Sequence, residues 1–176
     1  MTADPYANDG EIQRVGDHAV LRFERSYPNP IDDVWDALTN PTRIAQWWLP
    51  FDAEITVELV AGGAYELRGK GEGMPTLSWK ILLVEAPHVL EHTHVEPDVV
   101  IRWELAEHDG GCTLVFTQTV PDRSRFIQNG FAVGTHTSLD RLGSLLQGTP
   151  IEWDWDAMAV HQRRYAAAGL ASSPEE

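Results

Sequence analysis

The chain has 176 residues, enough for one compact domain, and its hydrophobic content of 43% is typical of a protein with a packed core. With 13 basic and 27 acidic residues, the formal net charge is −14, which argues against a nucleic-acid partner and against electrostatic docking on an anionic membrane. Cys112 is the single cysteine, so no internal disulfide is expected, and no secretory leader or apolar run of roughly 20 residues is present. These features predict a cytoplasmic protein.

The first third of the chain predicts one strand followed by two short helices. Residues 1–16 are polar and punctuated by proline and glycine, so we expect a flexible leader. Residues 19–25 alternate in polarity, as a half-buried strand does. Apolar side chains then recur at helical spacing over residues 31–38, and the stretch "PTRIAQWWLP" predicts a second short helix that Pro50 ends.

The middle of the chain predicts an antiparallel sheet, and a long helix follows it. Short turns rich in glycine and proline separate six predicted strands, at residues 53–60, 63–70, 77–84, 89–95, 99–106 and 112–120. A long helix is predicted from about residue 121 to 147. We therefore expect a domain over residues 17–148 and an extension over 149–176 with a short helix and a disordered end.

This order of elements predicts an α+β protein in which the long helix covers the apolar face of a curved antiparallel sheet. It resembles the helix-grip fold of the START-like (SRPBCC) superfamily. Within it, the chain resembles the proteins named after the C-terminal domain of the activator of Hsp90 ATPase. The resemblance rests on "RSYPNPIDDVWDALTNPTRIAQWW", "VELVAGGAYELR", "ILLVEAPHVLEHTH" and "LDRLGSLL".

The chain departs from this family at one place. Members usually carry a Gly-Trp pair one turn before the leucines of the final helix, whereas this chain has Gly134 and Thr135 there. A small hydroxyl-bearing side chain replaces an indole. The resemblance therefore implies more empty space beneath the helix than in a typical relative.

Strand alternation predicts which side chains face the final helix. His92 and His94 share the face of Leu90, and neighbouring strands bring aromatic side chains to the same surface. Such a wall, apolar with a few polar groups, is typical of a small-molecule site. We predict a cavity for a small hydrophobic or aromatic ligand, lined by Trp48, Trp79, His92, His94, Trp103, Phe116, Gln118, Phe131 and Thr135.

Three alternatives bear on these residues. The histidines could instead hydrogen-bond each other or the backbone as ordinary core residues. A metal held by His92 and His94 is not predicted, because no carboxylate is expected on that face, and no cofactor motif is present. Of the two adjacent tryptophans, we expect Trp48 to line the cavity entrance and Trp47 to pack in the core, although both could lie in the core.

A catalytic role is not supported, because the sequence shows no nucleophile paired with a base. The family resemblance implies a second function, protein binding as an Hsp90-type co-chaperone, and an enzyme that uses the cavity is the third hypothesis. In "EWDWDAM", Trp153 and Trp155 would point about 200° apart on a helix. One of them could then contact a partner or a second copy in a homodimer, or both could pack on the domain.

Overall fold

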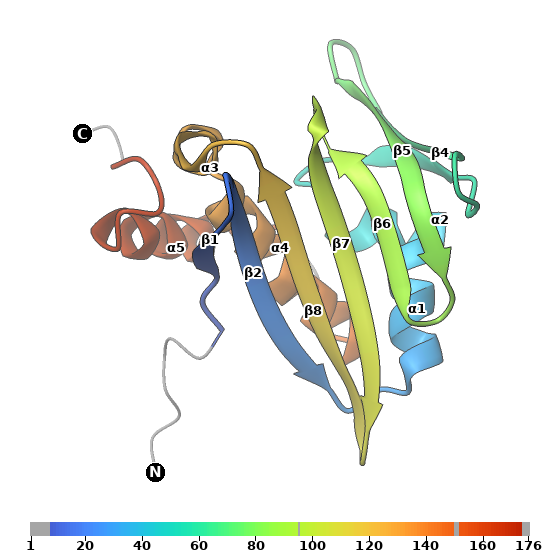
Figure 1. Cartoon of the computed structure of the whole chain (residues 1–176). Coiled ribbons are helices and arrows are strands. Elements are labelled where there is room, and N and C mark those ends of the chain that lie inside the picture. Colours follow the sequence, from blue (N-terminus) through green and yellow to red (C-terminus); the bar gives the residue numbers. More distant parts are fainter. Residues whose placement is uncertain (1–7, 95, 150–151, 174–176) are drawn as a thin grey trace.

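The computed structural model describes residues 8–94, 96–149 and 152–173 (Figure 1). Within them, eight strands form one antiparallel sheet in the order β1-β2-β8-β7-β6-β5-β4-β3. The predicted end of one strand at residue 95 lies outside the described residues. The strands are β1 (Glu11–Val15), β2 (His18–Tyr27), β3 (Ala53–Val57), β4 (Ala64–Gly69), β5 (Thr76–Glu85), β6 (Val89–His94), β7 (Glu96–His108) and β8 (Gly111–Val120).

The first strand corrects the prediction of a flexible leader over residues 1–16. Residues 11–15 form β1 and pair antiparallel with β2, from Glu11 opposite Arg22 to Val15 opposite His18. The strand is mostly exposed and sits at the sheet edge, so it lacks the apolar alternation that would have revealed it. The part of the leader before residue 8 is outside the described residues.

Two short helices follow β2 as predicted. Asn40 separates them, and its side-chain oxygen accepts a hydrogen bond from the backbone N–H of Thr42 at 3.0 Å, capping the second helix. Pro41 occupies the first position of that helix. A backbone N–H there would have no partner within the helix, so the missing N–H of proline costs nothing. The helices in the described part of the chain are α1 (Ile31–Thr39), α2 (Pro41–Trp47), α3 (Arg123–Asn129), α4 (Phe131–Leu146) and α5 (Trp155–Ala167).

The predicted helix over residues 121–147 is not continuous. Gly130 adopts a left-handed conformation with φ of 63°, and it divides the segment into α3 and α4. Glycine takes this conformation without steric cost, so it ends one helix and begins the next. The break matters for the site, because Gly130 and Phe131 line a pocket at this point.

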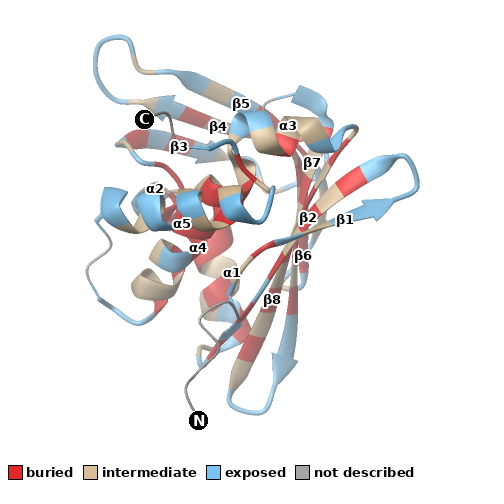
Figure 2. Ribbon diagram, turned by 90° about the vertical axis from the view of Figure 1, so that its left-hand side faces the viewer, coloured by how far each residue is buried: buried red, intermediate tan, exposed pale blue. Residues whose placement is uncertain are grey.

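All the helices lie on one face of the sheet, and the buried residues are concentrated between the two layers (Figure 2). Strand alternation assigned this face correctly: Leu90, Ile101, Leu105 and Leu114 are buried. The helix-grip architecture is therefore present, with α4 lying along the concave side of the sheet (Figure 1).

The C-terminal extension packs against the domain. Tyr165 of α5 is buried, and so is Ala171 beyond the helix, so the prediction of a disordered end is wrong at residue 171. Residues 174–176 are outside the described part of the chain. No helix in that part combines the length and apolar character needed to cross a membrane.

Candidate functional site

The two adjacent tryptophans at the end of α2 have different roles. The Trp47 indole N–H donates to the carbonyl of Ala37 at 2.9 Å, and the side chain is 1% exposed. Trp48 packs edge-on against Trp47 and Trp103, with ring centroids 5.2 and 5.4 Å apart, and its other side lines a pocket. This is the arrangement expected from their 100° separation, with Trp47 in the core and Trp48 at the pocket.

His92 lies within the core of the sheet's inner wall. Its Nε2 accepts a hydrogen bond from the Trp103 indole N–H at 3.1 Å, and its Nδ1 is 2.8 Å from the carbonyl of Thr93. Its ring stacks on Trp79 at 5.4 Å. Burial lowers the pKa of His92 from 6.5 to about 4, so the ring is neutral near pH 7. His92 is thus a satisfied core histidine, the alternative raised by the sequence.

His94, two residues along the same strand, lies closer to the surface. The Gln118 amide is 3.4 Å from its Nδ1, and its ring lies between Trp79 and Phe131, at centroid distances of 4.9 and 5.7 Å. Burial is the main cause that lowers its pKa to about 3, with a smaller contribution from His92. His94 therefore presents a neutral ring.

A cleft of about 240 Å³ lies between α4 and the end of this wall, and we call it the aromatic cleft. Its floor comes from strands β5 to β8, one side from α4, and the remaining sides from the turn after α2 and from the C-terminal extension. It is lined by Trp48, Leu49, Pro50, Leu77, Trp79, His94, Ile101, Gln118, Asn129, Gly130, Phe131, Gly134, Thr135, Ser138, Trp153 and Met158.

The cleft contains six of the nine side chains predicted from sequence: Trp48, Trp79, His94, Gln118, Phe131 and Thr135. The other three do not line it. Trp103 and Phe116 pack edge-on at 4.7 Å, and with His92 they fill the space behind the cleft. The expected deep cavity is thus wrong in extent, because the chain's own aromatic rings occupy its inner part.

Small residues on α4 leave the cleft open. A Cβ atom placed on Gly134 would meet no heavy atom within 4 Å, so this backbone borders empty space. One turn further on, the Ser138 hydroxyl donates to the carbonyl of Trp48 at 3.0 Å and ties α4 to the turn after α2. The prediction of space beneath the helix near Gly134 and Thr135 agrees with this geometry.

Sequence reasoning missed the outer wall of the cleft, which Trp153 and Met158 provide. Trp153 precedes α5, and the Arg141 guanidinium lies 5.1 Å from its ring centroid. Trp155 is 63% exposed, and the two indole centroids are only 5.7 Å apart. The expected 200° separation is wrong because Trp153 is not helical. The two tryptophans in "EWDWDAM" indicated a contact, but the sequence does not show which of the two rings faces the domain.

Uncharged side chains line the aromatic cleft throughout. Two of its indole N–H groups, on Trp79 and Trp153, are buried and have no hydrogen-bond partner among the described residues. A buried unpaired donor costs about 1–3 kcal/mol. Both nitrogens are inaccessible to solvent, so they do not offer donors to a molecule in the cleft. The cleft thus combines aromatic surface with uncharged polar side chains.

A larger groove of about 510 Å³ lies at the opposite edge of the sheet, lined by β1, the start of β2 and residues 121–123. Charged side chains such as Arg14, Asp17 and Asp122 border it. The lining of this groove is about half polar, whereas that of the aromatic cleft is mostly apolar, as in small-molecule sites. We therefore take the smaller aromatic cleft as the candidate site.

Comparison with known protein families gives a match over most of the domain. The family model described as "Activator of Hsp90 ATPase homolog 1-like protein" matches residues 28–147, which is more than half of the chain. No curated protein sequence matches. The matched segment includes every residue predicted for the site, but it ends before Trp153 and α5.

Solved structures share the fold. The crystal structure of CalU16 from Micromonospora echinospora has a TM-score of 0.70 at 26% identity, covering 92% of this chain and 97% of that one. A protein from Rhodobacter sphaeroides has a TM-score of 0.66 at 21% identity, covering 80% and 99%. A conserved protein of unknown function from Enterococcus faecalis has a TM-score of 0.68 at 17% identity, covering 92% and 94%.

Proposed function

From the premise that this chain belongs to the family of activator of Hsp90 ATPase homolog 1-like proteins, we propose that its aromatic cleft binds a small, uncharged aromatic molecule. The family's fold is suited to ligand binding, and the finer proposal rests on this chain's own residues. The observation that carries it is a cleft of about 240 Å³, bordered by aromatic rings and left open by glycine and threonine on α4.

The chemistry of the lining selects the ligand class. Trp48, Trp79 and Phe131 offer ring faces and edges, which favour a flat aromatic partner. No lining side chain carries a charge near pH 7, and an ionised ligand would lose its hydration without gaining a counter-charge.

The size of the cleft sets an upper limit on the ligand. Its volume of about 240 Å³ is below the roughly 300–1,000 Å³ of pockets that hold drug-sized molecules. A molecule of two or three aromatic rings is therefore expected. A ligand cannot reach further toward the sheet, because Trp103 and Phe116 fill the space behind the cleft.

A matched pair of fluorescent probes tests the proposal. N-phenyl-naphthylamine is neutral, and anilinonaphthalene sulfonate is the same ring system with an added sulfonate. The neutral probe should bind with enhanced fluorescence and raise the melting temperature as its concentration rises, whereas the sulfonated probe should bind at least about tenfold more weakly. Equal binding of both probes would contradict a site selected by an uncharged lining.

Variants at one position connect binding to the cleft. Gly134→Leu places a side chain into the open space beside α4, and it should weaken binding of the neutral probe by about tenfold or more. Gly134→Ala adds only a methyl group and should leave affinity within about threefold. If Gly134→Leu binds the probe as tightly as the unmodified protein, the probe binds elsewhere and the proposed site is wrong.

A second hypothesis is protein binding as an Hsp90 activator, suggested by the family description. The feature that favours a protein contact is the indole of Trp155 at the start of α5, which is 63% exposed. The test is the rate of ATP hydrolysis by Hsp90 with a molar excess of this protein. An unchanged rate would remove the hypothesis, and stimulation lost in Trp155→Ala would support it.

A further inference from the structure

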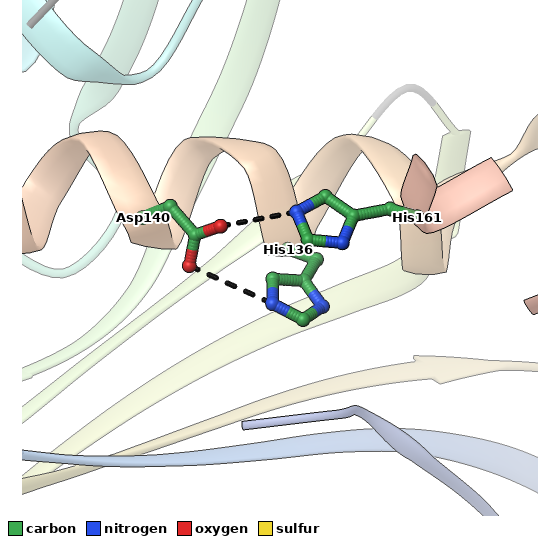
Figure 3. Close-up of side chains that lie close together, drawn as sticks. All are labelled: His136, Asp140 and His161. Carbon is green, nitrogen blue, oxygen red and sulfur yellow. Dashed lines mark hydrogen bonds and ion pairs between the residues drawn. The ribbon is translucent and has the colours of Figure 1, made fainter. Parts of the chain in front are cut away.

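A second group of polar side chains lies on the opposite side of α4 from the aromatic cleft, with its histidines buried and Asp140 exposed, and we call it the α4–α5 cluster. His136 and Asp140 belong to α4, and His161 belongs to α5 (Figure 3). Neighbouring elements complete it. Its members are Asp9, Arg25, His136, Asp140, His161, Arg164 and Tyr165.

The contacts in this cluster join α5 to α4. His161 Nε2 lies 3.0 Å from one Asp140 oxygen, and His136 Nε2 lies 3.6 Å from the other (Figure 3). The two imidazole rings stack with centroids 3.9 Å apart and an interplanar angle of 19°. On its other side, His136 Nδ1 is 2.8 Å from the Tyr165 hydroxyl.

The N-terminal segment closes the cluster. The Gly10 backbone N–H donates to the Tyr165 hydroxyl at 2.7 Å, and Asp9 pairs with Arg164. Since this hydroxyl accepts from Gly10, its own hydrogen is available for His136 Nδ1. That assignment leaves a neutral His136 ring whose Nε2–H faces Asp140.

Two histidines and a carboxylate also suggest a metal site, but the geometry argues against one. A metal must lie close to the plane of each imidazole that binds it, and two rings stacked nearly parallel at 3.9 Å direct their nitrogens side by side. The charges argue in the same direction. Arg25 and Arg164 already balance Asp140 and Asp9, so a divalent cation would leave an excess of positive charge here.

The cluster has a direct structural consequence for the aromatic cleft. Met158 on α5 and Trp153 just before it form the outer wall of the cleft. The buried residues of α5 itself are His161 and Tyr165, and both belong to the α4–α5 cluster. Docking of this wall therefore depends on this polar cluster together with the apolar packing of residues such as Met158 and Ala171.

We propose that α5, together with Trp153, is a movable wall of the aromatic cleft, and that the α4–α5 cluster is its latch, released when His136 gains a proton. The proposal concerns how the cleft opens, and it holds whether or not the neutral probe is the right ligand. A proton on Nδ1 would meet the hydroxyl hydrogen that Tyr165 now directs at it. It would also add a positive charge close to Arg25, Arg164 and His161. The negative charges that face the ring are those of Asp140 and Asp9.

The direction of the pH effect follows from the buried environment. Burial is the main cause that lowers the pKa of His136 from 6.5 to about 3, opposed by Asp140 and reinforced by the nearby cations. An undocked α5 would return this ring to water and to an ordinary pKa. Acidification below about pH 6.5 therefore shifts the equilibrium toward undocked α5, by up to about tenfold for each pH unit.

Fluorine NMR of the full chain labelled with fluorotryptophan tests the latch. Between about pH 7.5 and 5.5 the Trp153 resonance, assigned with Trp153→Phe, should shift or broaden as α5 undocks. Trp47 and Trp103 report on the core in the same spectrum and should not change. A Trp153 resonance that does not respond, or core resonances that change at the same pH, would overturn the proposal.

Two variants separate the latch from general instability. In His136→Gln, an amide keeps the hydrogen-bonding groups but cannot gain a proton, so the pH response of Trp153 should disappear; an unchanged response would contradict the proposal. Tyr165→Phe removes the hydroxyl and should produce the undocked Trp153 signal already at about pH 7.5. A zinc-induced rise in melting temperature that is lost in His136→Gln would replace the latch with a metal site.

Discussion

The two histidine pairs of this protein, one on the sheet and one between helices, differ in what surrounds them. His92 and His94 lie in the sheet among aromatic rings, where the Trp103 N–H and the backbone supply the hydrogen bonds of His92. His136 and His161 lie between two helices with Asp140 beside both. The first pair belongs to an apolar wall, whereas the second lies among charges that are balanced by one another.

This difference explains why one region suits ligand binding and the other suits movement. The sheet wall is rigid because its rings interlock, and the space left open is determined by small residues on α4. The helix interface depends on a few polar contacts whose strength changes with charge. A ligand should therefore bind at the sheet wall. Acidification should undock α5 from α4 before it disrupts the sheet wall.

The largest expected effect is acid destabilisation of the whole fold. His92, His94 and His136 have pKa values lowered to about 4, about 3 and about 3, so the folded state binds fewer protons than the unfolded state below pH 6.5. Stability is therefore full above about pH 6.5 and falls on acidification, by about 2 kcal/mol per histidine at pH 5. Urea unfolding above pH 6.5 and at pH 5 measures this loss of unfolding free energy. His94→Gln should reduce it, and an equal loss in that variant would argue against a neutral buried His94.

Trp103→Ala should cost about 3–5 kcal/mol of unfolding free energy, because it removes a buried indole and the donor to His92 Nε2. Trp155→Ala is the matched control on the surface, and it should change stability by less than about 0.5 kcal/mol. Denaturant unfolding compares the two variants. Equal costs would mean that the sheet wall is not the tightly packed region described above.

Asp140→Asn should cost about 1–2 kcal/mol, because the amide cannot balance Arg25 and accepts less strongly from His161. The cost stays small because the Asp140 side chain is 45% exposed and solvent screens its charge. Glu24→Gln disrupts an exposed pair with Arg22 and should cost under about 0.5 kcal/mol. Thermal unfolding of both variants at about pH 7.5 distinguishes a structural cluster from an ordinary surface pair.

The smallest expected effect is an increase in stability. Gly134→Ala should stabilise the protein by about 0.5–1 kcal/mol, because alanine favours the helix and its methyl group enters open space. Gly130→Ala should instead destabilise by about 1 kcal/mol, since this residue has φ of 63° between α3 and α4. Thermal unfolding measures both, and a destabilising Gly134→Ala would show that the cleft is closed at this point.

The sequence predicted the fold well because strand periodicity is a local property. The alternation in "VLEHTH" placed His92 and His94 on the inner face, and both lie there. The edge strand β1 was missed because an exposed edge carries no such alternation. Gly130 was included in a helix because its left-handed conformation can be recognised only from the backbone.

The candidate site was predictable only in part. Strand alternation shows which side chains share a face of the sheet, but it does not show how much of the space between them is filled. Trp103 and Phe116 satisfy the same pattern as Trp79, yet they pack against each other behind the cleft. The α4–α5 cluster was not predicted at all. His136 and His161 are 25 positions apart in the sequence, and only the docking of α5 brings them together.

The most direct test of the central claim is to locate the bound neutral probe by NMR. Nuclear Overhauser contacts between N-phenyl-naphthylamine and the methyl groups of Thr135 and Met158 are expected, because these two side chains line opposite sides of the aromatic cleft. A probe that binds without contacts to either methyl group, or that contacts residues of β1 instead, would contradict the account.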